Sequence, residues 1–254
     1  MKLMCSYSNC QGRGLVYFLR KSVMADYYEF VHYDNFRIIL GEQSPADLNK
    51  DAARCQVFIY QPTPALKYGS LSTEEMCTNV VPLDAFKVSF AYGFNHGFYP
   101  LVHHGSWRTS RQVLNLVKAC PQELLEAYDQ DRLEFDCFNR MIECLNEQRE
   151  RETAMDVKMA DWVLENFKRQ QLFICENHPA SAYFAELAGR VLKHLEPAWQ
   201  QELPFASEND AGLPCGMLVA PQVTKELELD YPAQPGAKAY FRKKLQELIK
   251  SNLE

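Results

Sequence analysis

No stretch of the 254-residue sequence offers the roughly 20 consecutive apolar residues that a helix needs to cross a bilayer. The opening residues, MKLMCSYSNCQ, turn polar too soon to form the apolar core of a signal peptide. With a formal net charge of -6, the chain also lacks the general basic field that attracts a nucleic-acid duplex. We therefore expect a cytoplasmic protein without a membrane span that binds no nucleic acid.

Paired-cysteine patterns are absent as well. The nine cysteines are an odd number and include no CxxC pair, which argues against both a disulfide framework and a thiolate zinc site. His96, His103 and His104 are close together in the chain, but they lack HxxxH or HxH spacing and neighbouring carboxylates. We expect no metal.

The first third of the sequence alternates strand and helix patterns. An apolar strand, Lys2 to Tyr7, leads through a polar turn into a helix from about Gly12 to Ser22. A second extended segment, Tyr28 to Leu40, precedes the helix SPADLNKDAARC, which has Ser44 as its cap and Pro45 at its first position. The short apolar run QVFIYQP is typical of a buried parallel strand. This order predicts a parallel sheet with helices on both faces.

The remaining sequence is richer in helix patterns. After the strand FKVSFAY comes GFNHGFYPLVHHGSW, which we interpret as a functional loop. Helical patterns dominate from about 110 to 170, and QLFICENHP is predicted to be the last strand of the sheet. We expect one α/β domain over residues 1–254, with a mainly helical region at about 110–170 inserted in its second half.

Candidate catalytic residues follow the predicted strands, since active sites of open parallel sheets lie beyond the carboxyl ends of the strands. Cys10 comes directly after the first strand, where the start of a helix is expected to lower the pKa of a thiol. His178, after the last strand, could serve as its base. Asn9 and Gln11 offer amide donors, from side chain or backbone, for an oxyanion. These residues indicate acyl transfer or acyl hydrolysis by a Cys-His pair.

The motifs carry a family resemblance. SNCQGRGL, VFIYQP, VPLDAFKVSFAYGFNHGFYP and ENHPASAYFAELAGRVL resemble, in order, the WcbI-type family of polysaccharide-biosynthesis acetyltransferases, between Met1 and Leu195. The resemblance implies an SGNH-hydrolase-like or flavodoxin-like three-layer sandwich around a mostly parallel sheet. It also implies acetyl transfer from coenzyme A to a sugar hydroxyl, in a sugar, nucleotide-sugar or polysaccharide acceptor, during capsule or surface polysaccharide synthesis.

The resemblance assigns roles to residues of this chain. Cys10 takes the nucleophile position and His178 that of the late catalytic histidine. The residues that it implies around the substrate are Asn9, Gln11, Gln61, His96 and Tyr99. Cationic side chains near the proposed mouth, which would meet the phosphates of coenzyme A, are Arg13, Arg108 and Arg111.

The chain departs from the family pattern at three positions. Ser8 replaces the glycine before Asn-Cys-Gln, and Gln234 stands where the family often has a histidine. An aspartate three residues before the late histidine is also missing, so that Glu176 is the candidate to orient His178.

Three functions remain open at this stage. The transferase could pass the acetyl group through Cys10 or directly to the sugar hydroxyl. An esterase or thioesterase of the same fold would use the same pair with water as acceptor. A non-catalytic binding protein would keep the fold without the chemistry.

Overall fold

The structure, a computed structural model, describes residues 1–91, 115, 117–133, 135–175, 178–199, 203 and 218–253. The chain divides into two compact units, each assembled from separate stretches of sequence. The first, called the sheet unit here, comprises Met1–Tyr92, Gln148–Asp161 and Ser181–Leu213. The second, called the helical unit, comprises Gly93–Glu147, Trp162–Ala180 and Pro214–Glu254. The expectation of a single domain stays a prediction.

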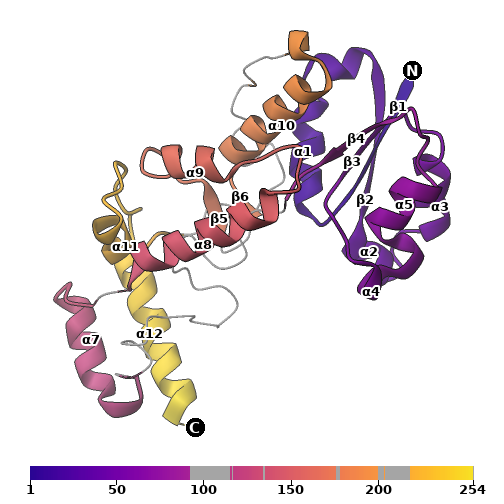
Figure 1. Cartoon of the computed structure of the whole chain (residues 1–254). Helices are drawn as coiled ribbons and strands as arrows, with labels where there is room; N and C mark the ends of the chain where they lie inside the picture. Colours follow the sequence, from indigo (N-terminus) through magenta and orange to yellow (C-terminus); the bar gives the residue numbers. More distant parts are fainter. Residues whose placement is uncertain are drawn as a thin grey trace. The chain divides into compact units, whose positions relative to one another are not determined.

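A parallel sheet forms the centre of the sheet unit (Figure 1). Its four strands in the described residues are β1 (Lys2–Ser8), β2 (Tyr28–Asp34), β3 (Val57–Tyr60) and β4 (Phe86–Ser89). They lie in the order β2-β1-β3-β4, and every neighbouring pair is parallel. The predicted α/β fold with a parallel sheet is confirmed.

Helices cover both faces of this sheet, which gives three layers (Figure 1). The helices of the sheet unit are α1 (Gln11–Leu19), α2 (Asn35–Ile39), α3 (Pro45–Ala52), α4 (Ala65–Tyr68), α5 (Thr73–Asn79) and α10 (Ser181–Leu195), with short 3-10 turns at Val23–Asp26, Gly69–Leu71 and Pro197–Trp199. On one face a buried apolar cluster joins β1 and β3 to α2, α3 and α5. On the other face α1 packs against β1 and β2, and α10 packs against α1.

The strand sequences explain this burial. Every residue of β1 after Lys2 is buried, as expected for a central strand with helices above and below it. The predicted cap of α3 is also confirmed, because the side chain of Ser44 accepts a hydrogen bond from the Asp47 N–H at 3.3 Å.

The helical unit contains α7 (Pro121–Asp129), α11 (Pro221–Glu226), α12 (Ala237–Leu253) and the strands β5 (Phe173–Cys175) and β6 (His178–Pro179). The helices α8 (Cys137–Glu152) and α9 (Ala160–Asn166) contribute residues to both units. The helix α7 packs against α12, where the Tyr128 hydroxyl donates to the Lys238 carbonyl at 3.1 Å. Across the described part of the chain, no helix combines the length and apolar character that crossing a membrane requires.

Two predicted strands differ from the structure. The extended segment beginning at Tyr28 ends at Asp34 rather than Leu40, because the Asp34 side chain caps the short helix α2. The predicted last strand of the sheet instead forms β5 and β6, an antiparallel pair that is separate from the parallel sheet in the described residues. Pro179 lacks the N–H that a strand inside a sheet would donate, which limits this segment to a short pairing.

Candidate active site

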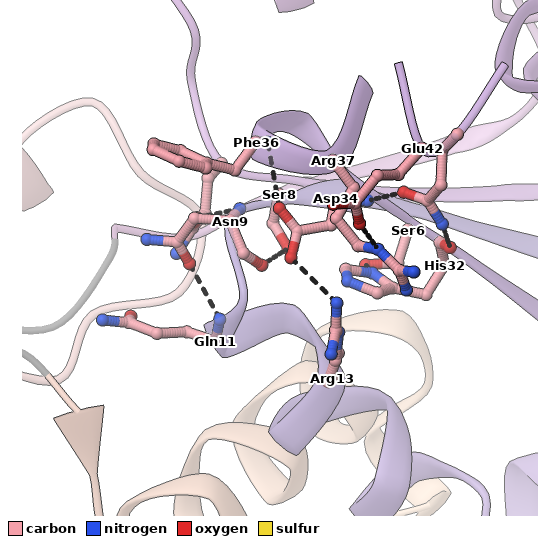
Figure 2. Close-up of polar contacts among 12 residues, drawn as sticks. Ser6, Ser8, Asn9, Gln11, Arg13, His32, Asp34, Phe36, Arg37 and Glu42 are labelled. Carbon is pink, nitrogen blue, oxygen red and sulfur yellow. Dashed lines mark hydrogen bonds and ion pairs between the residues drawn. The ribbon is translucent and has the colours of Figure 1, made fainter. Parts of the chain in front are cut away.

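The turn Ser8-Asn9-Cys10-Gln11 links the carboxyl end of β1 to the start of α1 (Figure 2). Its backbone is fixed by hydrogen bonds within the turn. The Gln11 N–H donates to the Asn9 Oδ1 at 2.9 Å, and the Gly12 N–H donates to the Asn9 carbonyl at 3.0 Å. Cys10 stands at the N-cap position of α1, is exposed, and is not part of a disulfide. The structure therefore holds the predicted nucleophile on a well-defined helix start.

Two glycines allow α1 to approach its neighbours closely. A Cβ on Gly12 would lie 1.9 Å from the Ser8 Oγ and 2.6 Å from the His32 Cε1. A Cβ on Gly14 would lie 2.7 Å from the ring of Phe184 in α10. The Ser8 hydroxyl, which this chain has in place of the family's glycine, thus occupies space left by the absent side chain at position 12.

Gln61 joins this turn from the neighbouring strand. The parallel pairing of β1 and β3 brings their carboxyl ends together, with Tyr7 opposite Tyr60. The Gln61 N–H donates to the Tyr7 carbonyl at 3.1 Å, and the Gln61 Oε1 accepts from the Asn9 N–H at 2.9 Å. The side chains predicted at positions 9, 10, 11 and 61 are therefore gathered at one edge of the sheet.

A buried carboxylate, absent from the sequence-based site, lies at the same edge. Asp34 ends β2 opposite Ser8 in the strand register, and its side chain accepts from the Phe36 N–H at 2.9 Å. It also pairs with Arg13 at 3.3 Å, as Figure 2 shows, while the Arg13 side chain remains about half exposed. The in-register parallel pairing of the first two strands was the signal that could have identified Asp34.

The pKa of the Cys10 thiol is raised, contrary to the lowered value expected at a helix start. Shielding of the thiol from water is the largest cause, although the residue as a whole is exposed, and the Asp34 carboxylate adds to it. Arg13 and the backbone N–H groups of Cys10 and Gln11 act in the opposite direction but do not prevail. The backbone N–H groups at the helix start lower the pKa of the thiol, as predicted. Desolvation and the Asp34 carboxylate outweigh this effect, so the prediction of a lowered pKa was wrong.

The side chain of His32 packs beside the start of α1. Its Nδ1 lies 3.3 Å from the Ser6 Oγ, and its ring lies in the space beside Gly12. Burial lowers the pKa of His32 to about 4, and the nearby charges of Arg13 and Arg20 contribute. The ring is therefore neutral at neutral pH and serves as packing beneath the turn.

His178 belongs to the helical unit, where it pairs with Cys175 across the β5–β6 ladder. Because Cys10 belongs to the sheet unit, the Cys10–His178 pair stays a prediction. Gln234 donates to the Gln171 Oε1 at 2.7 Å and accepts from the Val219 N–H at 2.8 Å, which are structural contacts.

Several predicted residues lie outside the described part of the chain. They are His96, Tyr99, Arg108, Arg111 and Glu176. Within the residues that the structure does describe, no group of three or more histidine, cysteine, aspartate or glutamate side chains is arranged to hold a metal ion.

Comparisons with known proteins agree with this architecture. The family model described as "Polysaccharide biosynthesis enzyme WcbI" matches residues 3–199. A solved structure of WcbI, described as a novel polysaccharide biosynthesis enzyme, superposes with a TM-score of 0.77 at 20% sequence identity, covering 98% of this chain and 90% of that one. No curated protein matches the chain. Since the family model covers most of the sequence, including the Cys10 turn and His178, the chain belongs to the WcbI family of polysaccharide biosynthesis enzymes.

Proposed function

We propose that this protein is an acyltransferase that moves an acetyl group from coenzyme A to a sugar hydroxyl during capsule or surface polysaccharide synthesis. The observation that carries the proposal is Cys10, which stands at the N-cap of α1 at the carboxyl edge of a parallel sheet, in a turn that the side chains of Asn9 and Gln61 hold by hydrogen bonds. Its support from outside the chain is the family match and the related WcbI structure, which is described as the native protein without a disulfide bond between coenzyme A and one of its cysteines.

Proton removal is the first task of such a site. With its pKa raised, the Cys10 thiol is protonated at neutral pH, and a thiol must lose its proton before it can attack a carbonyl carbon. We assign this role to His178 as general base. In the alternative route His178 takes the proton of the sugar hydroxyl directly and Cys10 positions the reacting groups.

The described residues fit a phosphate-bearing acyl donor. Acetyl-coenzyme A, when bound, would supply the acetyl group from its thioester, with coenzyme A as the leaving thiol. Arg13 presents a half-exposed guanidinium one turn into α1 from Cys10 and pairs with the buried Asp34 at 3.3 Å. A guanidinium forms forked hydrogen bonds to phosphate oxygens, which makes Arg13 the described candidate for this contact. We assign the same role to Arg108 and Arg111, and substrate contacts to His96 and Tyr99.

Release of free thiol from acetyl-CoA tests the proposal. The full-length protein is incubated with acetyl-CoA, with and without a panel of sugars and nucleotide sugars, beside Cys10→Ala and His178→Ala. The proposal predicts acceptor-dependent release that both variants lose by about 10²-fold or more, the range of a missing general base.

The remaining outcomes separate the competing functions. Release without any acceptor, lost in both variants, identifies a thioesterase. Absence of both release and coenzyme A binding, measured by calorimetry, identifies a non-catalytic protein. Acetyl-Cys10 detected by mass spectrometry in a short reaction without acceptor supports the covalent route.

A further inference from the structure

Gln61 carries a side-chain amide whose orientation is fixed by the backbone. Its Oε1 accepts from the Asn9 N–H at 2.9 Å, so its NH₂ group must point away from that contact. The residue is only 2% exposed. Among the residues that the structure describes, the Gln61 Nε2 has no hydrogen-bond acceptor.

A second glutamine, at the other end of β3, shows that a side-chain bond of this kind does not require an unpaired donor. Gln56, at the amino end of the strand, accepts from the Leu3 N–H at 2.7 Å and donates its own N–H to the Leu3 carbonyl at 2.9 Å. Its Nε2 also donates to the Arg54 carbonyl at 3.0 Å. The two glutamines attach β3 to β1 in the same way, and only the one beside Cys10 leaves its amide donor unsatisfied.

An unsatisfied buried donor destabilises a folded protein by about 1–3 kcal/mol. Such a group in a folded protein calls for an explanation, and one explanation is a catalytic role in which a substrate supplies the acceptor. The bond from the Asn9 N–H to the Gln61 Oε1 places the Gln61 amide group next to the backbone of Asn9, the residue before the candidate nucleophile.

The backbone of the turn leaves few other donors. The N–H groups of Asn9, Gln11 and Gly12 all donate to acceptors within the chain. The N–H that follows a nucleophile is a common oxyanion donor, but here the Gln11 N–H is bonded to the Asn9 side chain.

We propose that the Gln61 Nε2 donates the hydrogen bond that stabilises the acyl oxygen during transfer. This inference rests on the proposed acyltransferase function. When the nucleophile forms its bond to the carbonyl carbon, the π electrons of the C=O bond move to the oxygen. Gln61 donates to that oxygen without giving up its proton, and the electrons return as the leaving thiolate departs.

The test compares Gln61→Glu with the matched control Gln56→Glu. Glutamate has the same shape and still accepts from the Asn9 N–H, but its ionised form cannot donate. We expect Gln61→Glu to lower the rate of acetyl transfer by about 10²–10³-fold, the cost of one oxyanion donor, with coenzyme A binding retained. Gln56→Glu should keep the wild-type rate.

The pH profile separates this role from a structural one. A glutamic acid that is protonated can donate a hydrogen bond, so the ratio of the Gln61→Glu rate to the wild-type rate should rise as the pH is lowered. Gln61→Met, uncharged and of similar length, should be slow at every pH. Thermal unfolding of both variants verifies that they are folded at the assay temperature.

Three results would overturn the inference. A wild-type rate in Gln61→Glu or Gln61→Met means that the donor is not used. A rate ratio that does not change with pH means that Gln61 acts through structure. If the wild-type protein transfers no acetyl group to any acceptor, the proposed function fails first, and the role of Gln61 fails with it.

Discussion

Cys10 lies between opposite charges that adjust its thiol. The Asp34 carboxylate raises the pKa of Cys10, and the Arg13 guanidinium lowers it, while the two side chains pair with each other at 3.3 Å. A ligand phosphate that binds Arg13 would therefore change the balance of charge at the Cys10 thiol.

Replacing Asp34 should lower the pKa of Cys10. Asp34→Asn removes the negative charge but keeps an oxygen that can cap α2 at the Phe36 N–H. The rate of alkylation of Cys10 by iodoacetamide, followed against pH, reports the thiolate fraction. We expect the midpoint to shift to lower pH in Asp34→Asn and to higher pH in Arg13→Gln.

The control is Glu42→Gln, which removes an exposed carboxylate that pairs with Arg37. Its profile should match the wild type. Unchanged midpoints in both Asp34→Asn and Arg13→Gln would show that these charges do not reach the thiol.

His32 should make stability depend on pH. Its pKa is lowered to about 4 in the folded protein from the ordinary histidine value of about 6.5, so the unfolded chain binds more protons between these values. The stabilisation is fully present above pH 6.5 and is lost as the pH falls toward 4. By this linkage the residue contributes about 2 kcal/mol less to stability at pH 5 than at pH 7.

Urea unfolding at the two pH values measures this effect. The difference in unfolding free energy between pH 7 and pH 5 should be about 2 kcal/mol smaller in His32→Gln than in the wild type. Equal differences in the two proteins would mean that His32 is not buried as a neutral ring.

At the scale of elements, the position of α1 depends on close packing against α10. The ring of Phe184, which is 1% exposed, lies 2.7 Å from the position that a Cβ on Gly14 would take. The close packing at Gly14 and at Gly12 fixes the position of the first turn of α1, and with it that of Cys10.

Gly14→Ala should destabilise the protein despite the better helix propensity of alanine. A Cβ 2.7 Å from the ring forces a displacement of α1 or Phe184, and overpacking of this kind costs about 1–3 kcal/mol. Phe184→Leu leaves room for the added methyl group. The double-mutant cycle in urea should give a coupling that offsets part of the loss, whereas simple additivity would contradict the contact.

The element pattern of the sheet unit was largely predictable because buried parallel strands are short apolar runs between polar turns. The strand starting at Tyr28 was predicted too long, since most residues from 36 to 40 are apolar and the Asp34 cap starts a helix there. The pair β5–β6 was misassigned because an apolar run does not reveal which strand it pairs with. The sequence places Cys10 and Gln61 at strand ends, but the bond between Gln61 and Asn9 depends on the register of two strands.

At the scale of the whole molecule, the structure distinguishes the cysteines by exposure. Cys10 is exposed, whereas Cys5 and Cys137 are buried, and burial raises the pKa of both buried thiols. Brief alkylation of the native protein followed by peptide mapping should modify Cys10 well before the other two. Comparable early labelling of Cys5 would contradict the described core, and labelling in urea supplies the reference for full exposure.

Neither of the two units contains both predicted catalytic residues. Cys10, its amide neighbours and Arg13 belong to the sheet unit, and His178 belongs to the helical unit. The sequence predicted both residues from their places after strands, and the family match spans both. The proposed cooperation of Cys10 and His178 must therefore be measured in the full-length chain.

The most direct measurement is the initial rate of acceptor-dependent release of coenzyme A from acetyl-CoA by the wild type and by Cys10→Ala, at equal concentrations of folded protein. We expect release by the wild type and a loss of about 10²-fold or more in the variant. Equal rates in the two proteins would contradict the role of Cys10 and with it the proposed mechanism.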